Sequence, residues 1–469
     1  MSRSTVVVWF RRDLRVDDHP ALMAAVAEAN AVGGQVTPVF VVEPDLAAAA
    51  GVNRCRFIAG CVDALDAELD GHLVLRTGPA AVAVPRLAAE VGARLVFVTS
   101  DHAPTGVRRD RAVELALAEA GRRLVAVGSP YAVAPGSVRT AAGRPFAVFT
   151  PFRRAWEAHG WPEPTGRPRS VRFRDAPSDV GTDALGGVGR GTSATVLPAA
   201  GPGPAAVLLE RFLDDALDTY ARDRDRPDRA GTSRLSPYLR FGCLHPRQVL
   251  AGLADRSAPT GPRAGGPLGE RGSGAAGFTT ELAWREFYAD VLAHHPRSAW
   301  EPVVAAGRYL RVDTGPEADR RFTAWSTGRT GFPLVDAGMR QLLAEGWVHN
   351  RVRMVAASLL VKDLHLDWRR GARWFLDHLF DGDVASNNHG WQWVAGTGTD
   401  AAPFHRVFNP VLQRARFDPD GTYVRRYVPE VDAFGYPEPI VDHAAERAEA
   451  LARWAEARRA AAAEETERR

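Results

Sequence analysis

Cysteine is scarce in this chain of 469 residues, lysine occurs once, and long hydrophobic runs are missing. The three cysteines, Cys55, Cys61 and Cys243, are too few and too scattered for a disulfide framework, a zinc knuckle or a four-thiolate cluster. We therefore expect a reducing, cytoplasmic environment and no bound metal.

The apolar stretch near the start, residues 5–10, ends at the charged triplet Arg11-Arg12-Asp13. These charges exclude both a signal-peptide core and an 18-residue membrane span. The sequence therefore predicts a soluble, unexported protein with no membrane partner.

The charges nearly balance, with 59 Lys and Arg residues against 56 Asp and Glu residues and a net charge of +3. A nucleic-acid partner would therefore need a local basic patch. Lys362 is the only lysine, so 58 of the 59 basic residues are arginine, and the richness in Ala, Gly and Arg fits a GC-rich genome.

Short apolar runs recur about every 30 residues over the first 130 residues, separated by Ala-rich segments with helical spacing. The runs are Val6–Phe10, Val36–Val42, Leu73–Leu75, Arg94–Val98 and Leu124–Val127. This alternation is typical of βαβ units, and continuous apolar runs suit strands buried on both faces. We predict an α/β fold with an N-terminal Rossmann-like, doubly wound parallel sheet that binds ligands at the carboxyl ends of its strands. The ordinary dinucleotide fingerprint Gly-x-Gly-x-x-Gly does not follow the first run.

Changes in composition predict the domain limits. Residues 1–155 form the α/β domain, and 156–204, rich in Pro, Gly, Ser and Arg, form a surface linker. Residues 205–442 have helical patterns and predict an all-α domain, with a low-complexity insertion at 257–277. Residues 443–469 form a helical or disordered tail with little apolar face, which we expect to be solvated.

Residues 332–361 have the periodicity of two consecutive helices with apolar stripes. Asn350, Arg353 and Met354 share the opposite face of the second helix. Alone, this patch would indicate an ordinary hydrated face. The downstream triplet Asp381-Gly382-Asp383 offers carboxylates for Arg353 and acceptors for a buried heterocycle, which favours a ligand site.

Tryptophan is abundant, with twelve residues in the chain, and most are expected in the core. The run Asn387–Trp393 differs, because it places two indoles and four polar side chains within seven residues. Such a run is a poor core segment and a good wall for a ligand.

Five motifs resemble, in family order, the flavin-binding motifs of the photolyase/cryptochrome family. They are Thr232–Tyr238 (TSRLSPY), Glu281–Tyr288 (ELAWREFY), His349–Met354 (HNRVRM), Asp381–Asp383 (DGD) and Asn387–Trp393 (NNHGWQW). The opening Trp9–Arg15 (WFRRDLR) is similar to the first strand and loop of that family. The resemblance covers about residues 5–155 and 205–440, and within the family it points to class I cyclobutane pyrimidine dimer photolyases. It implies an N-terminal antenna domain and a C-terminal helical domain that holds FAD in a bent conformation.

The resemblance implies a set of residues that bind FAD, active as FADH⁻. The set comprises Tyr220, Thr232, Ser233, Arg234, Leu235, Ser236, Arg285, Asn350, Arg353, Asp381, Gly382, Asp383 and Asn387. Hydroxyls and N–H groups at a helix start would meet the phosphates. Arg353 would pair with Asp381. Asn387 matches the residue opposite flavin N5, where a neutral amide tolerates the reduced anionic flavin and favours a repair enzyme.

The implied substrate is a pyrimidine dimer in DNA, which must be flipped out of the duplex before an enzyme can contact it. By resemblance Trp284 and Trp393 flank the dimer, and Glu281 hydrogen-bonds the pyrimidine edge and steadies the radical anion. Asn350 and Met354 would line the same pocket. The alternatives are an ordinary ion pair for Glu281 and core packing for Met354. (6-4) photolyases carry a second histidine at the position of Met354, so methionine favours cyclobutane dimers.

Electrons would enter through a relay of indoles. Trp391 and Trp368, twenty-three residues apart as in the family, match its first two members. The distal member has no matching tryptophan, so Trp325, Trp300 or Tyr309 could replace it, or the relay could be short. We expect Trp325 to serve, with slow or rerouted photoreduction.

The segment Ser100–Gly106 (SDHAPTG) resembles the deazaflavin-binding members of the family more than the folate-binding ones. Arg11, Asp101 and Gly106 are the implied antenna residues, although Ala103 replaces an acidic residue of the pattern. The resemblance favours 8-hydroxy-5-deazaflavin over methenyltetrahydrofolate as the antenna chromophore. An empty domain or a second flavin are the alternatives.

UV-damaged DNA is the expected partner of a monomeric protein, with strong salt dependence and little sequence specificity. The candidate phosphate contacts are Arg240, Arg340, Arg406 and Arg414. Each has a solvated surface arginine as the alternative interpretation.

The predicted function is light-driven repair of cyclobutane pyrimidine dimers by electron transfer from photoexcited FADH⁻, a carbon–carbon lyase reaction. One alternative is a cryptochrome-like blue-light signalling protein, against which the short stretch after Asp442 argues. The other is a (6-4) photolyase. The three cysteines exclude an iron–sulfur photolyase.

Overall fold

The computed structural model describes residues 4–257, 268–400, 403–404 and 406–468. Its N-terminal part contains a parallel sheet of five strands in the order β3-β2-β1-β4-β5. The strands are β1 Thr5–Phe10, β2 Gln35–Val42, β3 Val74–Thr77, β4 Leu95–Val98 and β5 Arg123–Ala126. Each lies within two residues of the apolar run that predicted it, and the predicted fold class is confirmed.

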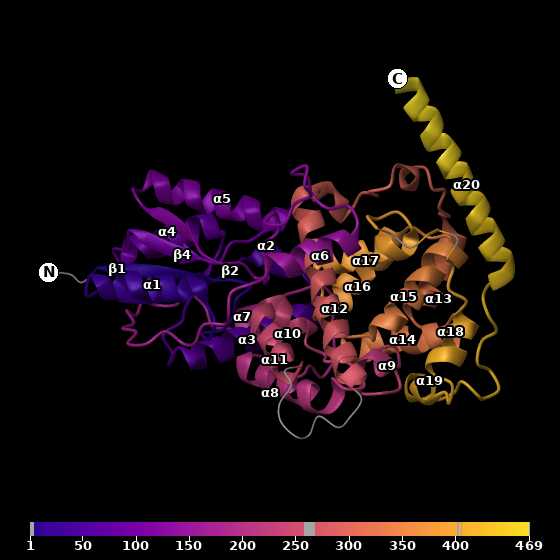
Figure 1. Cartoon of the computed structure of the whole chain (residues 1–469), viewed down its shortest axis with the longest axis horizontal. Helices are drawn as coiled ribbons and strands as arrows, with labels where there is room; N and C mark the ends of the chain where they lie inside the picture. The colour runs from indigo at the N-terminus through magenta and orange to yellow at the C-terminus, as the bar shows by residue number, and fades with distance from the viewer. Residues whose placement is uncertain (1–3, 258–267, 401–402, 405, 469) are drawn as a thin grey trace.

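Helices surround this sheet (Figure 1). The helices on its two faces are α1 Pro20–Ala31, α3 Val52–Glu68, α4 Ala80–Glu90 and α5 Pro104–Glu119. The short helix α2 Pro44–Ala48 follows β2, and α6 Phe149–His159 packs against the helix Leu268–His294 of the second part of the chain. Alternate residues of β1 face opposite sides. Val6, Val8 and Phe10 pack with α1 and α3, whereas Val7 and Trp9 pack with α4 and α5. Both faces of the sheet are therefore buried, which explains the continuous apolar runs.

The segment 160–204 is largely irregular, as its composition predicts, but it follows a defined path along the α/β domain. The backbone of Val36 on β2 donates to Arg172 O over 2.8 Å and accepts from Arg174 N over 2.9 Å. The short helix α7 Asp183–Gly186 buries Leu185. We keep 1–155, 156–204 and 205–442 as proposed domain limits.

In the second part of the chain, the regular elements among the described residues are all helices. Its first elements are α8 Pro202–Arg211, the π-helix η1 Phe212–Ala216, α9 Tyr220–Asp223, α10 Ser236–Phe241, α11 Pro246–Ser257 and α12 Leu268–His294. The 3-10 helices η3 Pro296–Ala299 and η4 Ala305–Arg308 follow. The remaining elements are α13 Pro316–Ser326, α14 Pro333–Glu345, α15 Asn350–Ser358, the π-helix η5 Leu359–Asp363, α16 Trp368–His378, α17 Val384–Ala395, α18 Pro410–Phe417, α19 Thr422–Tyr427 and α20 His443–Arg468.

The predicted insertion at 257–277 needs correction. Residues 258–267 lie outside the described residues, and residues 268–277 belong to helix α12. Ala275 and Phe278 on this helix are buried in the core, so the last residues of the predicted insertion belong to a packed helix and not to an irregular loop.

The C-terminal segment is the helix α20, and one of its faces is packed and not solvated, contrary to our expectation. Ala450, Arg453 and Ala457 are buried. Arg453 pairs with Asp313 over 2.6 Å. Alanine side chains leave room for this close approach, which a search for large apolar residues does not detect.

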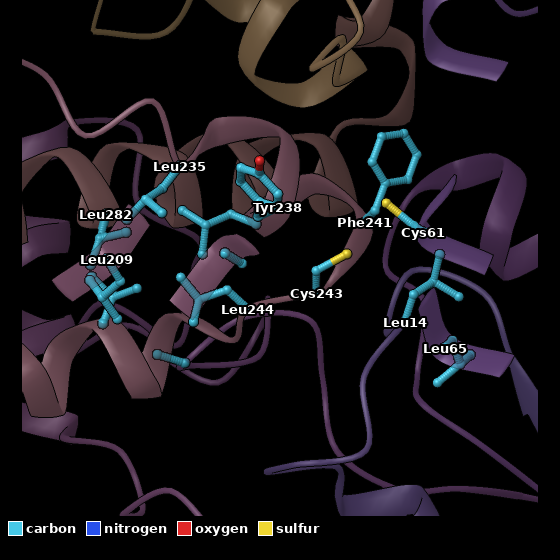
Figure 2. Close-up of a cluster of buried hydrophobic side chains, with 14 of the residues drawn as sticks. Leu14, Cys61, Leu65, Leu209, Leu235, Tyr238, Phe241, Cys243, Leu244 and Leu282 are labelled. Atoms are coloured by element: carbon cyan, nitrogen blue, oxygen red, sulfur yellow. The ribbon is translucent and has the colours of Figure 1, made fainter. Parts of the chain in front are cut away.

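The two parts of the chain share one continuous apolar core (Figure 2). Leu14 and Cys61 of the α/β domain lie in the same cluster as Tyr238 and Phe241 of α10. The backbone also joins the parts, because Leu14 N donates to Phe241 O over 3.0 Å. The carboxyl ends of the strands therefore face the helical domain at a fixed distance (Figure 1). Within the described residues, no helix combines the length and the apolar character needed to cross a membrane.

Candidate functional site

A cavity of about 520 Å³ opens inside the helical domain between α10, α12, α15, α16 and α17. It brings together most of the residues predicted for the flavin and the substrate. Those that line it are Ser233, Ser236, Glu281, Trp284, Arg285, Asn350, Arg353, Met354, Asp381, Gly382, Asp383, Asn387, Trp391 and Trp393. Motifs separated by more than 150 residues of sequence thus meet at one cavity.

The other predicted residues lie away from the lining. They are Tyr220, Thr232, Arg234, Leu235, Trp325, Trp368 and Arg406. Leu235 and Tyr220 are buried in the core behind the loop. The Arg234 side chain stacks on Trp347, 4.2 Å from the ring centroid, and pairs with Glu345 over 3.3 Å. Its guanidinium therefore has partners outside the cavity.

One side of the cavity carries a connected ion pair. Arg353 donates to the Oδ2 of Asp381 over 3.0 Å, as predicted, and Ser236 Oγ donates to the same oxygen over 2.7 Å. The second oxygen of this carboxylate, Oδ1, is buried without a hydrogen-bond partner among the described residues. A buried acceptor without a donor is costly, so a ligand that brings an N–H or O–H group would be stabilised here.

Asp383 caps the start of α17 and lies between two arginines. Its Oδ1 accepts from Ala385 N, and its Oδ2 lies 2.9 Å from Arg12 and 3.2 Å from Arg240. Burial alone raises the pKa of Asp383, but the charges of Arg240 and Arg12 outweigh burial and hold the pKa below its ordinary value. The carboxylate is therefore ionised, and an arginine from the α/β domain holds a residue of the cavity wall.

Asn387 lies one turn into α17 with its amide held in place. The Nδ2 group donates to Ala372 O over 3.0 Å and to Asn388 Oδ1 over 2.8 Å. Because both bonds use the NH₂ group, the amide oxygen is the polar atom that this side chain presents to a ligand. A carbonyl oxygen accepts from the N5–H group that a reduced flavin carries.

Two indoles and a carboxylate form the part of the cavity predicted for the dimer. Trp284 on α12 stacks on Phe149 of α6, with ring centroids 3.6 Å apart and planes at 8°. One face of this indole is therefore covered, and Trp393 on α17 lines the cavity with it. Glu281 forms an ion pair with Arg224 over 2.6 Å. The sequence prediction missed both partners: Arg224 lies one helical turn after Tyr220, which is a usable signal, whereas no pattern marks Phe149.

The polar groups that line the cavity fit a flavin dinucleotide. The cavity combines the unpaired acceptor on Asp381, the ionised Asp383, the amide of Asn387 and the hydroxyls of Ser233 and Ser236. The apolar remainder of the lining includes Phe375, Leu379 and Ala357. Apolar walls with a few directed polar groups are typical of sites for planar heterocycles.

The tryptophans behind the cavity form two branches. Trp391 lines the cavity and meets the fully buried Trp325 at a centroid distance of 5.9 Å and 69°. A Cβ atom added to Gly371 would lie 2.2 Å from the Trp391 ring, so α16 approaches this indole closely only because residue 371 is glycine. Trp368, one turn earlier on α16, stacks on the half-buried Trp300 at 6.4 Å and 13°.

A second cavity, of about 810 Å³, lies between the carboxyl ends of the strands and the helical domain. The predicted antenna residues Arg11, Asp101 and Gly106 all line it. The Asp101 carboxylate lies against Gly106, and Arg109 contacts it over 3.4 Å. Three residues line both cavities, namely Arg240, Gly382 and Asp383. Arg240 therefore lies in the wall between them, which corrects our expectation that it reaches DNA phosphates at the surface.

Comparison with known proteins agrees with this geometry. Residues 6–169 match the family model described as DNA photolyase, and residues 278–435 match the model described as FAD binding domain of DNA photolyase. The deoxyribodipyrimidine photo-lyase of Streptomyces griseus is 41% identical over 475 residues, which cover 95% of this chain and 98% of that protein.

Two solved structures share the whole fold. A class III photolyase from Agrobacterium tumefaciens has a TM-score of 0.87 at 33% identity, covering 98% of each chain. An archaeal photolyase from Sulfolobus tokodaii, solved with two FAD molecules, has a TM-score of 0.80 at 27% identity, covering 96% of this chain and all of that one. The matches span both domains, and we conclude that this chain belongs to the DNA photolyase family.

Proposed function

We propose that this chain is a deoxyribodipyrimidine photo-lyase, which splits cyclobutane pyrimidine dimers in DNA with the energy of blue light. The observation that carries the proposal is the single cavity in which the flavin-type donor set and the pair Trp284 and Trp393 meet. Relatives that match this chain over nearly their full length are named deoxyribodipyrimidine photo-lyase. When bound, FAD supplies the excited electron that opens the dimer.

The protein residues prepare this reaction by binding and orientation. The free face of Trp284 and the ring of Trp393 offer stacking surfaces to a flipped-out pyrimidine dimer. Glu281 lies at the same rim, where its carboxyl group can hydrogen-bond the pyrimidine edge once it leaves Arg224. Asn350 and Met354 line the wall between the stacking surfaces and the flavin position.

The cofactor is held by groups from several elements. We assign Arg353, Asp381 and Ser236 to one polar edge, Asn387 to the N5 edge, and Asp383 to the ribityl side. We assign the phosphates to the Thr232–Ser236 loop and Arg285, with Tyr220 nearby. Support comes from the lining of the cavity and from the matched FAD-binding domain.

The electron relay has two candidate exits from Trp391. Trp325 is fully buried, and its indole N–H donates to Ala356 O over 2.9 Å. Trp300 is only half-buried, stacks on Trp368, and lines the larger cavity. Exchange with a soluble thiol requires exposure, so we favour Trp300 as the distal donor and keep Trp325 as a side branch.

The larger cavity is the proposed antenna site. Its volume of about 810 Å³ accommodates a tricyclic chromophore, and Arg11, Asp101 and Gly106 lie in its wall. We favour 8-hydroxy-5-deazaflavin over methenyltetrahydrofolate. The Sulfolobus tokodaii relative with two FAD molecules makes a second flavin the main alternative. Extraction of the purified protein and chromatography of the released chromophores distinguish the three.

The macromolecular partner is UV-damaged DNA, bound by a monomer with little sequence specificity. Arg406 is exposed, and we assign it to a backbone phosphate beside the dimer. Arg414 is half-buried, whereas Arg340 pairs with Glu430 over 2.6 Å and has less charge to offer.

A light-and-dark assay tests the proposal. The purified, anaerobically reduced protein is incubated with two oligonucleotides, one with a thymine cyclobutane dimer and one with a (6-4) photoproduct, and lesion loss is followed by chromatography. Loss of the cyclobutane dimer only under blue light supports the proposal. Loss of the (6-4) lesion alone would establish the (6-4) activity, and loss of neither despite bound reduced FAD would favour cryptochrome-like signalling.

A further inference from the structure

Lys362 is the only lysine among 59 basic residues, and its side chain is fully buried, with a relative exposure of 0%. Lysine is rarely found fully buried unless it has a partner. The chain uses arginine at every other basic position. A compact ammonium ion differs from a planar guanidinium in size and donor geometry, so this position has a specific requirement.

The ammonium group holds two backbone carbonyls that are distant in sequence. Lys362 lies on η5, the π-helical turn that continues α15, and donates to Phe404 O over 3.1 Å and to Arg406 O over 2.9 Å. It also lies 4.7 Å above the Phe404 ring. The adjacent Asp363 adds negative charge nearby. Two of the three ammonium donors therefore fix the backbone on either side of residue 405.

The same backbone packs on the end of α17, the helix that carries Asn387, Trp391 and Trp393. Phe404 packs on Gly396, where an added Cβ atom would come within 2.9 Å of the ring, and Gly396 caps α17 three residues after Trp393. From the other side Trp454 of α20 stacks on Phe404 at 4.4 Å and 3°. The Arg406 side chain is exposed. The backbone is therefore held from two sides, while the exposed Arg406 side chain can reach a partner.

We propose that Lys362 is a positioning residue for DNA binding, because its ammonium fixes the carbonyls of Phe404 and Arg406 and so directs the Arg406 side chain toward a phosphate beside the flipped dimer. This inference rests on the proposed function, in which Arg406 contacts DNA. Replacing the ammonium by an apolar group leaves two buried carbonyls without a donor, which moves this backbone. The lining of the cavity comes from other residues, so we expect the FAD content to stay unchanged.

A double-mutant cycle tests the inference on the FAD-loaded protein. The variants are Lys362→Met, Arg406→Ala and the two combined. The measurement is the Kd in the dark for a labelled oligonucleotide with one thymine dimer, at several salt concentrations, together with the FAD content of each variant. Coupled residues give non-additive losses, and loss of one phosphate contact reduces the salt slope by about 1.

We expect each single variant to weaken binding about 10-fold and to reduce the salt slope similarly, at unchanged FAD content. The combined variant should bind about as weakly as Arg406→Ala alone. Equal losses from Lys362→Met in the presence and absence of Arg406 would overturn the inference, as would a loss of FAD. If Arg406→Ala leaves the Kd unchanged, the proposed phosphate contact fails and the role of Lys362 fails with it.

Trp454→Ala provides a second route if Lys362→Met does not fold. This change loosens the same backbone from the side of α20 and leaves the buried lysine in place. We expect a smaller loss of affinity, about 3-fold, that disappears in the Arg406→Ala background. A loss that persists in that background would contradict the inference.

Discussion

Phe149 lies flat against Trp284, with ring centroids 3.6 Å apart and planes at 8°. The two rings come from different parts of the chain, since Phe149 begins α6 and Trp284 lies on α12. The α/β domain therefore covers one face of the indole that is assigned to the substrate. The opposite face is left to the cavity, and its orientation depends on this contact.

Phe149→Ala should weaken binding of dimer-containing DNA by roughly 2- to 10-fold, the range expected for loss of one aromatic pair. Bound FAD should be unaffected, because Phe149 does not line the cavity. Fluorescence anisotropy with a labelled oligonucleotide measures the effect. Phe146→Ala is the control, since Phe146 packs on Phe152 and its loss should leave the Kd within 2-fold of wild type. Equal Kd values for Phe149→Ala and wild type would show that the orientation of the Trp284 indole does not depend on Phe149.

Arg12→Gln should weaken FAD binding although residue 12 belongs to the α/β domain. Its guanidinium lies 2.9 Å from Asp383, and its removal raises the pKa of that carboxyl group and loosens the start of α17. We expect the bound FAD to be lost about 3- to 10-fold faster on dilution. The absorbance of the flavin measures this loss. Arg86→Gln removes an exposed ion pair with Glu90 and Asp179 and should change nothing. Identical FAD release from Arg12→Gln and Arg86→Gln would contradict the role of Arg12.

Trp300→Phe should slow the photoreduction of oxidised bound FAD at least 5-fold in the presence of a thiol, because it removes the half-buried end of the stacked pair with Trp368. Trp325→Phe should slow it less than 2-fold, because that indole is fully buried. Absorbance under continuous blue light measures both rates. The reverse order would move the exit to Trp325. Dimer repair by chemically reduced enzyme should be normal in both variants.

Alkaline pH should stabilise the wild-type protein relative to Lys362→Met. Burial lowers the pKa of Lys362 to about 8, below the ordinary value of 10.5. Between these values the unfolded chain binds the proton more tightly, so the free energy of unfolding rises with pH. From pH 8 to 9.5 the gain is on the order of 2 kcal/mol. The chain has no second lysine to titrate in this window.

The measurement for this prediction is the apparent melting temperature of both proteins at each pH. The difference between them cancels the contributions of tyrosines, cysteines and the terminal amine, which both proteins share. A difference that stays constant from pH 8 to 9.5 would show that Lys362 does not titrate there.

The sequence predicted the sheet, and it marked the motifs that meet at one cavity, because both depend on local patterns. The run Val6–Phe10 is recognisable as a buried strand from its apolar residues alone, and the Asn387–Trp393 run is recognisable as a ligand wall from its unusual mixture. In each case the chemistry that forms the structure lies within a few consecutive residues.

Long-range packing was not predictable in the same way. Nothing near Phe149 or Arg12 indicates that they meet Trp284 and Asp383, more than 130 residues away. Arg240 illustrates the opposite error, because an arginine in an exposed-looking motif proved to lie between two cavities. Such contacts depend on how the two domains join, and hydrophobic periodicity carries no information about that arrangement.

The excited-state lifetime of the bound reduced flavin tests most directly whether the cavity near Trp284 and Trp393 holds the dimer beside the cofactor. The lifetime is measured with saturating amounts of either a dimer-containing or an undamaged oligonucleotide. Contact between flavin and dimer predicts a lifetime shortened several-fold by the dimer alone. Equal lifetimes with both oligonucleotides, at proven saturation, would contradict a shared cavity.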